Sequence, residues 1–302
     1  MSTYLCLTQV YKSSKVVPFD DSSKLVFFSD CHRGDSSWAD DFARNQNLYN
    51  FALEHYYNQG YTYIEIGDGD ELWKNRRFDE IAQAHSDTFR IIRKFYNAGR
   101  LYMLLGNHDI VKKGKRFQKN CMYRFYNIQE DRYDLLFDNM EVHEGLILKH
   151  KLTGNRIFVF HGHQGDIIND HMWYIGRFLV RYLWRHLELL GFNDPTSPAR
   201  NYTRKGTVEK NIINWVRANR QMVITGHTHR PMFPNPGQPP YFNDGSCVHP
   251  YSITGIEIQN GEIVLVKWSV KVNNAGVLYI ERDVIAGPEK LQAFFDNWRS
   301  RL

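Results

Sequence analysis

Five short apolar runs in this chain each end abruptly in aspartate, asparagine or histidine. The residues that follow the runs are Asp30-Cys31-His32, Gly67-Asp68, Gly106-Asn107-His108-Asp109, His161-Gly162-His163 and Gly226-His227-Thr228-His229. Short apolar runs bounded by polar and glycine residues predict buried strands. The carboxyl ends of neighbouring strands in an α/β sheet open onto one edge, where ligands usually bind. The sequence therefore predicts a sheet whose loops bring several metal-ligating side chains to a single edge.

Segments of the type Asp-x-His and His-x-His, such as Asp30-Cys31-His32 and His227-Thr228-His229, separate two donors by one residue. In extended backbone, residues i and i+2 project to the same side, so each tripeptide can present both donors to one site. Imidazole combined with carboxylate and amide oxygen suits manganese, iron or zinc, and no thiolate is needed. A carboxylate can bridge two cations, and such a pair activates hydroxide and stabilises in-line displacement at phosphorus. We expect two divalent metal ions, manganese first, with iron or zinc as alternatives.

The order of the predicted elements indicates an α/β fold. In the first half, strands at Leu25–Phe28, Tyr61–Ile66 and Leu101–Leu105 alternate with helices near 38–59 and 79–99. The second half has candidate strands at Arg156–Phe160, Met222–Ile224, Ser252–Ile258, Glu262–Val270 and Val277–Arg282, and a final helix at Glu289–Arg299. We expect a two-sheet sandwich with outer helices. It would form a single domain over residues 1–302, with a helical insertion at about 166–210.

The composition limits which classes of partner and which cellular compartment are expected. The formal charge of +5 suits an anionic substrate, whereas no basic tract is dense enough to predict nucleic-acid binding. The four cysteines are far apart in the sequence, which favours a reducing compartment over a disulfide framework. Neither a leader-like segment nor an apolar span is evident. We expect a cytoplasmic location, with peripheral membrane contact left open.

The ordered set D-x-H, GD, GNH-D, H and GH-x-H, from Leu25 to Pro231, resembles the calcineurin-like metallophosphoesterases. This resemblance implies a four-layer α/β/β/α sandwich with a dinuclear metal centre. It also implies the ligands: Asp30, His32, Asp68 and His229 for one metal, and Asn107, His161 and His227 for the other, with Asp68 bridging. The activity implied is hydrolysis of a phosphate ester or anhydride by metal-activated hydroxide.

Three roles in these motifs need separate assignment. His161 and His163 both follow the fourth strand, and His161 is favoured because the family's ligand is usually the histidine directly after it. His108 looks like the family's second-sphere histidine, which protonates the leaving group or stabilises charge. By the same resemblance, Asp109 would orient His108.

A narrower resemblance is to the UDP-2,3-diacylglucosamine pyrophosphatases of lipid A synthesis. It rests on residues 67–73, 114–117 and 226–231, and those enzymes also insert a helical cap between their last two histidine motifs. They carry an arginine where this chain has His108, and HGD where it has His161-Gly162-His163. The resemblance places the chain among their relatives, with a phosphorylated small molecule or a lipid-linked compound as the expected substrate.

The expected insertion contains a basic helical face. Arg177, Arg181 and Arg185 recur at intervals of four residues, which aligns them on one side of a helix. One interpretation is an amphipathic helix with a solvated basic face. The other is a lid in which Arg177 and Arg181 bind phosphate oxygens of the substrate. A function of another class also stays open, a non-catalytic metal-binding scaffold on the same fold.

Overall fold

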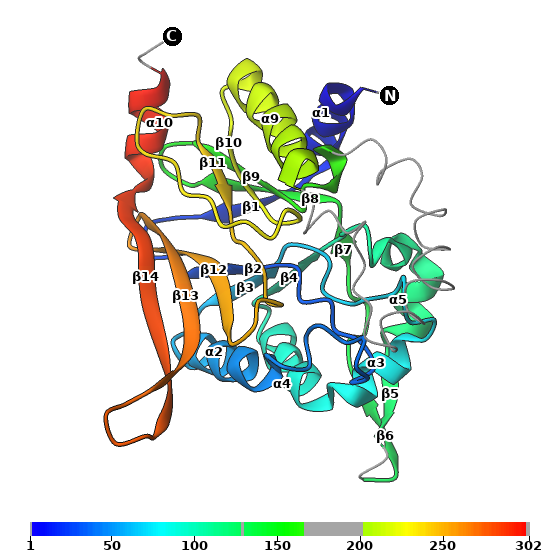
Figure 1. Cartoon of the computed structure of the whole chain (residues 1–302). Coiled ribbons are helices and arrows are strands. Elements are labelled where there is room, and N and C mark those ends of the chain that lie inside the picture. Colours follow the sequence, from blue (N-terminus) through cyan, green and yellow to red (C-terminus); the bar gives the residue numbers. More distant parts are fainter. Residues whose placement is uncertain (1, 128–129, 166–201, 300–302) are drawn as a thin grey trace.

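The structure is a computed structural model, and it describes residues 2–127, 130–165 and 202–299. Two sheets pack face to face, and helices cover both outer faces (Figure 1). This arrangement confirms the predicted four-layer α/β/β/α sandwich. Within these ranges, no helix combines the length and the apolar character that crossing a membrane requires.

The larger sheet carries three of the five ligand-bearing strand ends. Its seven strands lie in the order β14 (Leu278–Lys290), β13 (Glu262–Val272), β12 (Ser252–Gln259), β2 (Leu25–Phe28), β3 (Thr62–Glu65), β4 (Leu101–Leu104) and β7 (Val142–His143). Strands β2, β3, β4 and β7 are parallel, and β12 to β14 form an antiparallel extension. The helices α2 (Gln46–Asn58), α3 (Phe78–Ala84) and α4 (Ser86–Asn97) cover its outer face.

The smaller sheet carries the other two ligand-bearing strand ends. Its order is β1 (Lys15–Phe19), β8 (Gly145–His150), β9 (Arg156–Phe160), β10 (Met222–Thr225) and β11 (Tyr241–Asn243). Strands β9, β10 and β11 are parallel, so their carboxyl ends lie at one edge. The helices α1 (Thr3–Ser13) and α9 (Tyr202–Asn219) pack side by side on the outer face (Figure 1). Outside the sandwich layers are η1 (Ile110–Lys113), α5 (Lys115–Cys121), the hairpin β5 (Arg124–Asn127) and β6 (Arg132–Leu135), η2 (His163–Gly165) and α10 (Leu291–Arg299).

Strand alternation explains how a run without polar residues fits between two layers. Val26 and Phe28 on β2 join the core beneath the helices, whereas Phe27 between them joins the core shared by the two sheets. Successive side chains of a strand point to opposite faces, so a strand buried on both faces must be apolar throughout. The first polar residues after β2, Ser29 and Asp30, lie where the strand leaves the core.

Two predicted helices differ from those observed. The helix expected near 38–59 begins only at Gln46, because the Asp40 carboxylate accepts hydrogen bonds from the Ser36, Phe42 and Ala43 amides and holds a turn. The segment near 79–99 forms two helices, α3 and α4, which are separated at His85. The His85 ring is hydrogen-bonded to Asp40 and Gln46, which fixes this break.

The predicted insertion falls mainly on residues 166–201, which lie outside the described residues. Its last part belongs to α9, which continues past residue 210 to Asn219. Buried Val208, Ile212 and Trp215 pack this helix on the smaller sheet. Helices α9 and α1 and strands β1, β8 and β11 were not predicted from the sequence.

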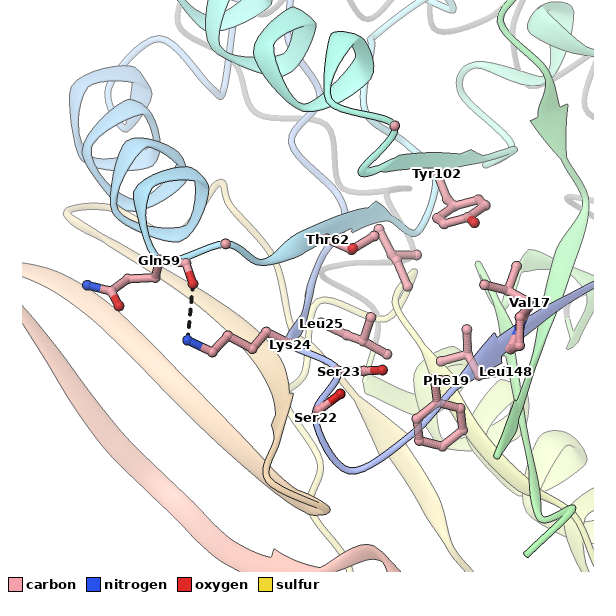
Figure 2. A pocket seen from close by; sticks show the side chains of 14 residues that line it. Val17, Phe19, Ser22, Ser23, Lys24, Leu25, Gln59, Thr62, Tyr102 and Leu148 are labelled. Atoms are coloured by element: carbon pink, nitrogen blue, oxygen red, sulfur yellow. Dashed lines mark hydrogen bonds between the residues drawn. The ribbon is translucent and has the colours of Figure 1, made fainter. Parts of the chain in front are cut away.

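A cavity of about 480 Å³ lies between the sheets, where β2, β3 and β4 begin. Figure 2 shows apolar Val17, Phe19 and Leu148 in its wall, with Lys24 donating a hydrogen bond to the Gln59 carbonyl at 3.1 Å. The predicted metal ligands all lie in the described part of the chain, and none of them lines this cavity. The candidate site therefore lies elsewhere, at the ends of the strands rather than at their beginnings.

Candidate metal centre

Strand ends from both sheets bring the predicted ligands together. Two groups form: Asp30, His32 and His229, and Asp68, His161 and His227. Within each group the potential ligand atoms lie within 4.8 Å of one another. Each group combines residues from both sheets, so packing of the two sheets on each other is what assembles the site.

Asp68 belongs to the second group and also lies close to the first. Its Oδ2 atom is 3.2 Å from His161 Nε2 and 3.8 Å from His32 Nε2. The Asp30 Oδ1 atom is 3.0 Å from His229 Nε2 and 3.7 Å from His32 Nε2. A carboxylate with ring nitrogens of both groups within about 4 Å is suited to bridge two cations.

Five of these residues have left-handed backbone conformations. The φ angles are 51° at Asp30, 49° at His32, 49° at Asp68, 69° at His227 and 52° at His229. Such conformations cost on the order of 1–3 kcal/mol each in a residue with a side chain, and they persist where surrounding structure enforces them. Hydrogen bonds from Asp30 N to the Gly67 carbonyl and from His32 N to the Asp68 carbonyl, 3.1 and 2.9 Å long, hold two of these loops together. Strained backbone at this many ligand positions indicates a functional site.

Buried polar atoms without hydrogen-bond partners show what this site can hold. Among the described residues they include Asp30 Oδ1, His32 Nε2, His161 Nε2, His227 Nε2 and both side-chain polar atoms of Asn107. Leaving a buried donor or acceptor unsatisfied costs about 1–3 kcal/mol. Nitrogen and oxygen ligands of these kinds fit divalent transition metals. The residues present therefore fit a pair of divalent cations.

The opposite atoms of the same side chains are engaged in hydrogen bonds. His161 Nδ1 lies 2.7 Å from the Ile66 carbonyl, and His32 Nδ1 lies 3.1 Å from Glu71 Oε2. The Asp68 Oδ1 atom accepts a hydrogen bond from His108 N at 2.8 Å. Contacts of this kind orient metal ligands and fix which ring nitrogen faces the metal. They leave each Nε2 atom and Asp68 Oδ2 for the site.

The two candidates for the fourth-motif ligand have different surroundings. His161 belongs to the group with Asp68 and His227, whereas His163 belongs to neither group. The His163 ring centroid is 6.5 Å from that of His227, compared with 5.1 Å for His161. This geometry supports the choice of His161.

His108 is held by a carboxylate and an indole. Its Nδ1 atom lies 2.8 Å from Glu71 Oε2, and its ring stacks on Trp73 with centroids 4.2 Å apart. The Trp73 indole N–H in turn donates to the Asn107 carbonyl at 2.6 Å. His32, Glu71 and His108 also lie within ligand distance of one another, and hydrogen bonds to Glu71 account for this grouping.

The orienting role expected for Asp109 is corrected by these contacts. The Asp109 carboxylate accepts hydrogen bonds from the Gly106 amide at 2.8 Å and the Gly69 amide at 3.2 Å, and it pairs with Lys112. The carboxylate on His108 belongs to Glu71 instead. Glu71 and Trp73 were not predicted as site residues, although both lie in the segment 67–73 that carries the narrower family resemblance. The proposed substrate-binding residues Arg177 and Arg181 lie outside the described residues.

Burial and neighbouring charges shift the pKa values of the ligands in the metal-free protein. Burial opposes ionisation of Asp30, but His229 and His161 outweigh it and hold the pKa of this carboxyl well below its usual range. Burial also disfavours a charged His161, yet Asp68 and Asp30 raise its pKa to about 9. His227 has a pKa lowered to about 3 by burial and by His161.

Metal binding to this site is expected to release protons. His161 is cationic below its pKa of about 9 in the metal-free protein, and it must lose a proton to bind a metal through Nε2. Apparent affinity for Mn²⁺ should therefore rise with pH up to the His161 pKa of about 9, by about tenfold per pH unit for each proton released. Calorimetric titration at pH 7 in buffers of different ionisation enthalpy measures this release. Equal heats in all buffers would contradict it.

Comparison with known proteins gives the family of this chain. The family model described as calcineurin-like phosphoesterase matches residues 23–231. The solved structure of Vps29 from Chaetomium thermophilum aligns over 88% of this chain and 97% of that chain, with 10% sequence identity and a TM-score of 0.38. No curated protein matches this sequence. Since the family model spans most of the chain, including both ligand groups, the chain belongs to the calcineurin-like phosphoesterase family.

Proposed function

We propose that this protein is a hydrolase that binds two divalent metal ions and cleaves a phosphate ester or anhydride. One observation carries the proposal: the two groups of ligands face each other at Asp68, and among the described residues the buried Nε2 atoms of His32, His161 and His227 have no hydrogen-bond partner. Asp30, His32, Asp68 and His229 would hold one ion. Asp68, Asn107, His161 and His227 would hold the other.

A bound pair of divalent cations supplies an activated water molecule and stabilises charge on a phosphoryl group. The protein's own side chains balance the charge of the cations and donate the proton. Asp30 and Asp68 supply the negative charge that offsets the cations, and His108 donates a proton to the departing oxygen. Burial opposes ionisation of Glu71, but His108 and His32 outweigh it and hold the pKa of this carboxyl well below its usual range. Glu71 is therefore a carboxylate, which accepts a hydrogen bond from His108 Nδ1. That hydrogen bond leaves His108 Nε2 as the atom that carries the transferred proton.

The stacked Trp73 ring restricts the plane of His108 and covers one face of its imidazole. His108 keeps a side-chain exposure of 16%, so a substrate can still reach it. General acids positioned in this way contribute typically about 10²–10⁴-fold to rate. His108 and Glu71 therefore act as an acid and the carboxylate that orients it.

The substrate class is proposed from the sequence motifs and the charge of the chain. Segments 67–73, 114–117 and 226–231 favour a UDP-sugar-lipid pyrophosphatase as the specific alternative. The wider proposal is a phosphorylated small molecule or a lipid-linked compound, with manganese as the metal and the cytoplasm as the compartment. Nucleic acid is not an expected partner, and contact with a membrane surface stays part of the lipid-linked alternative.

Turnover by metal-reconstituted protein tests this proposal. The protein is freed of metal with a chelator, reloaded with Mn²⁺, and assayed on p-nitrophenyl phosphate, bis-p-nitrophenyl phosphate and a UDP-diacylglucosamine analogue. We expect hydrolysis that disappears on chelation and returns with Mn²⁺, and preference for the UDP-lipid would assign the substrate. Two bound metal ions without turnover of any of the three substrates would favour the non-catalytic scaffold.

A further inference from the structure

A chain of five charged side chains lies buried beside the metal centre. Glu65, Arg33, Asp70, Lys112 and Asp109 are each at most 1% exposed. Arg33 binds Glu65 through two hydrogen bonds of 2.7 and 3.0 Å, and it donates from Nε to Asp70 at 2.7 Å. Lys112 Nζ lies 2.6 Å from Asp70 and 2.8 Å from Asp109. The five side chains therefore form one continuous network, which we call the buried ion network.

Three members of the buried ion network lie on loops that carry metal ligands. Arg33 directly follows His32, Asp70 follows Asp68 by two residues, and Asp109 follows Asn107 by two residues. The network thus links the loops after β2, β3 and β4. Its members are absent from both ligand groups, and none of them has a part in the proposed chemistry.

Backbone contacts run parallel to the side-chain network. Arg33 N donates to the Gly69 carbonyl at 3.0 Å, and Glu71 N donates to the Arg33 carbonyl at 2.9 Å. The Asp109 carboxylate accepts from the amides of Gly69 and Gly106, in the loops after β3 and β4. A Cβ atom on Gly69 would lie 2.2 Å from Glu65 Oε1 and 2.6 Å from Arg33 Nη2. The loops pack on the network without spare space, so movement of one loop displaces the others.

A contribution to folding stability does not by itself explain why the protein has the buried ion network. Replacing buried ion pairs by apolar side chains of similar volume is often neutral or stabilising, because desolvation offsets the attraction between the charges. A different explanation is that the buried ion network holds the ligand-bearing loops in the conformation that binds metal. Replacing residues that orient metal ligands without binding the metal typically lowers metal affinity by about 10–100-fold.

We propose that Arg33 and Lys112 are positioning residues, which hold the three ligand loops in register and thereby set the affinity of the metal centre. This inference rests on the proposed metal centre. Arg33 fixes the loop after β2 to that after β3, and Lys112 fixes the loop after β3 to that after β4. Loss of the charged side chain of Arg33 or Lys112 should therefore make metal ligands less well positioned, even where that side chain does not contact them.

Metal affinity of Arg33→Met and Lys112→Met tests the inference without recourse to catalysis. Mn²⁺ binding to the metal-free proteins is followed by calorimetric titration, alongside thermal unfolding. Arg282→Met is the matched control, because Arg282 also pairs with a buried glutamate of the larger sheet, Glu257, at 2.7 Å. We expect about 10–100-fold weaker Mn²⁺ binding in the two network variants. The control should bind Mn²⁺ as the original protein does.

Two further variants allow the inference to be tested even if Arg33→Met does not fold, and show whether Arg33 and Lys112 act through one network. Arg33→Lys retains the charge but not the paired contacts to Glu65, so it should also weaken Mn²⁺ binding, and it replaces Arg33→Met if that variant does not fold. The double variant should lose less affinity than the product of the two single losses, because both act on one network. Unchanged Mn²⁺ affinity in folded Arg33 and Lys112 variants would overturn the inference, as would equal losses in the Arg282 control. Absence of Mn²⁺ binding to the original protein would instead overturn the proposed function beneath it.

Discussion

Replacing Asp68 by asparagine is expected to abolish measurable hydrolysis while leaving the fold intact. The amide oxygen can still accept the hydrogen bond that the His108 amide now donates to Asp68 Oδ1 at 2.8 Å. It lacks the charge needed to bridge two cations, and stabilisation by such cations supplies several kcal/mol. Since each 1.36 kcal/mol is a factor of ten in rate, kcat should fall by at least about 10³-fold.

The measurement is kcat on bis-p-nitrophenyl phosphate together with metal content per chain. Asp134→Asn serves as the matched control, because Asp134 lies on the β5–β6 hairpin and pairs with Arg132 and Asn127 rather than with the ligand groups. The control should keep full activity and full metal content. An Asp68→Asn protein that retained a tenth of the original activity would contradict the bridging role.

Replacing His108 by alanine is expected to lower kcat by about 10²–10⁴-fold, the usual contribution of a general acid. Metal content should not change, because the His108 ring is held by Glu71 and Trp73 and lies outside both ligand groups that surround Asp68. The loss should be smaller for a substrate whose leaving group needs no proton, such as a nitrophenolate, than for an alkyl ester.

Comparing an aryl with an alkyl phosphate ester therefore separates proton donation from structural damage. His55→Ala is a suitable control, since His55 lies on α2 against Tyr56 and Trp268, away from the ligand groups. If His108→Ala lost metal instead, His108 would be a ligand. If both substrates slowed equally, His108 would act by stabilising charge rather than by donating a proton.

The sequence predicted that these side chains gather at one edge, because they directly follow apolar strands. Asp30 comes immediately after Ser29 at the end of a strand buried on both faces, and Asp68 and His227 each follow a glycine at the end of another. A strand period of two and the rule that ligands gather at the carboxyl edge place these residues without knowledge of tertiary contacts. The two-sheet sandwich followed from the same strands.

The contacts behind the ligands were not predictable in this way. Glu71 reaches both His32 and His108 because the loop after β3 is held against the loop after β2 by long-range hydrogen bonds. Asp109, adjacent to His108 in sequence, turns instead toward the amides of Gly69 and Gly106. The family resemblance had suggested Asp109 for this role, but the direction of its side chain depends on hydrogen bonds to two loops.

Helix α9 was missed for a related reason. Its sequence begins in a polar stretch, and the burial of Val208, Ile212 and Trp215 depends on the neighbouring helix α1 and on the smaller sheet. Isolated helical segments of this length gain most of their stability from tertiary packing. Local propensity therefore gave little indication of α9.

The most direct test of the account is anomalous diffraction from crystals of the Mn²⁺-loaded protein. With two metal ions bound as proposed, we expect two manganese peaks roughly 3.5–4 Å apart, one on each side of the Asp68 carboxylate. One peak should contact Asp30, His32 and His229, and the other Asn107, His161 and His227. A single peak, or a peak bound by Glu71 and His108 instead, would contradict the two-metal centre.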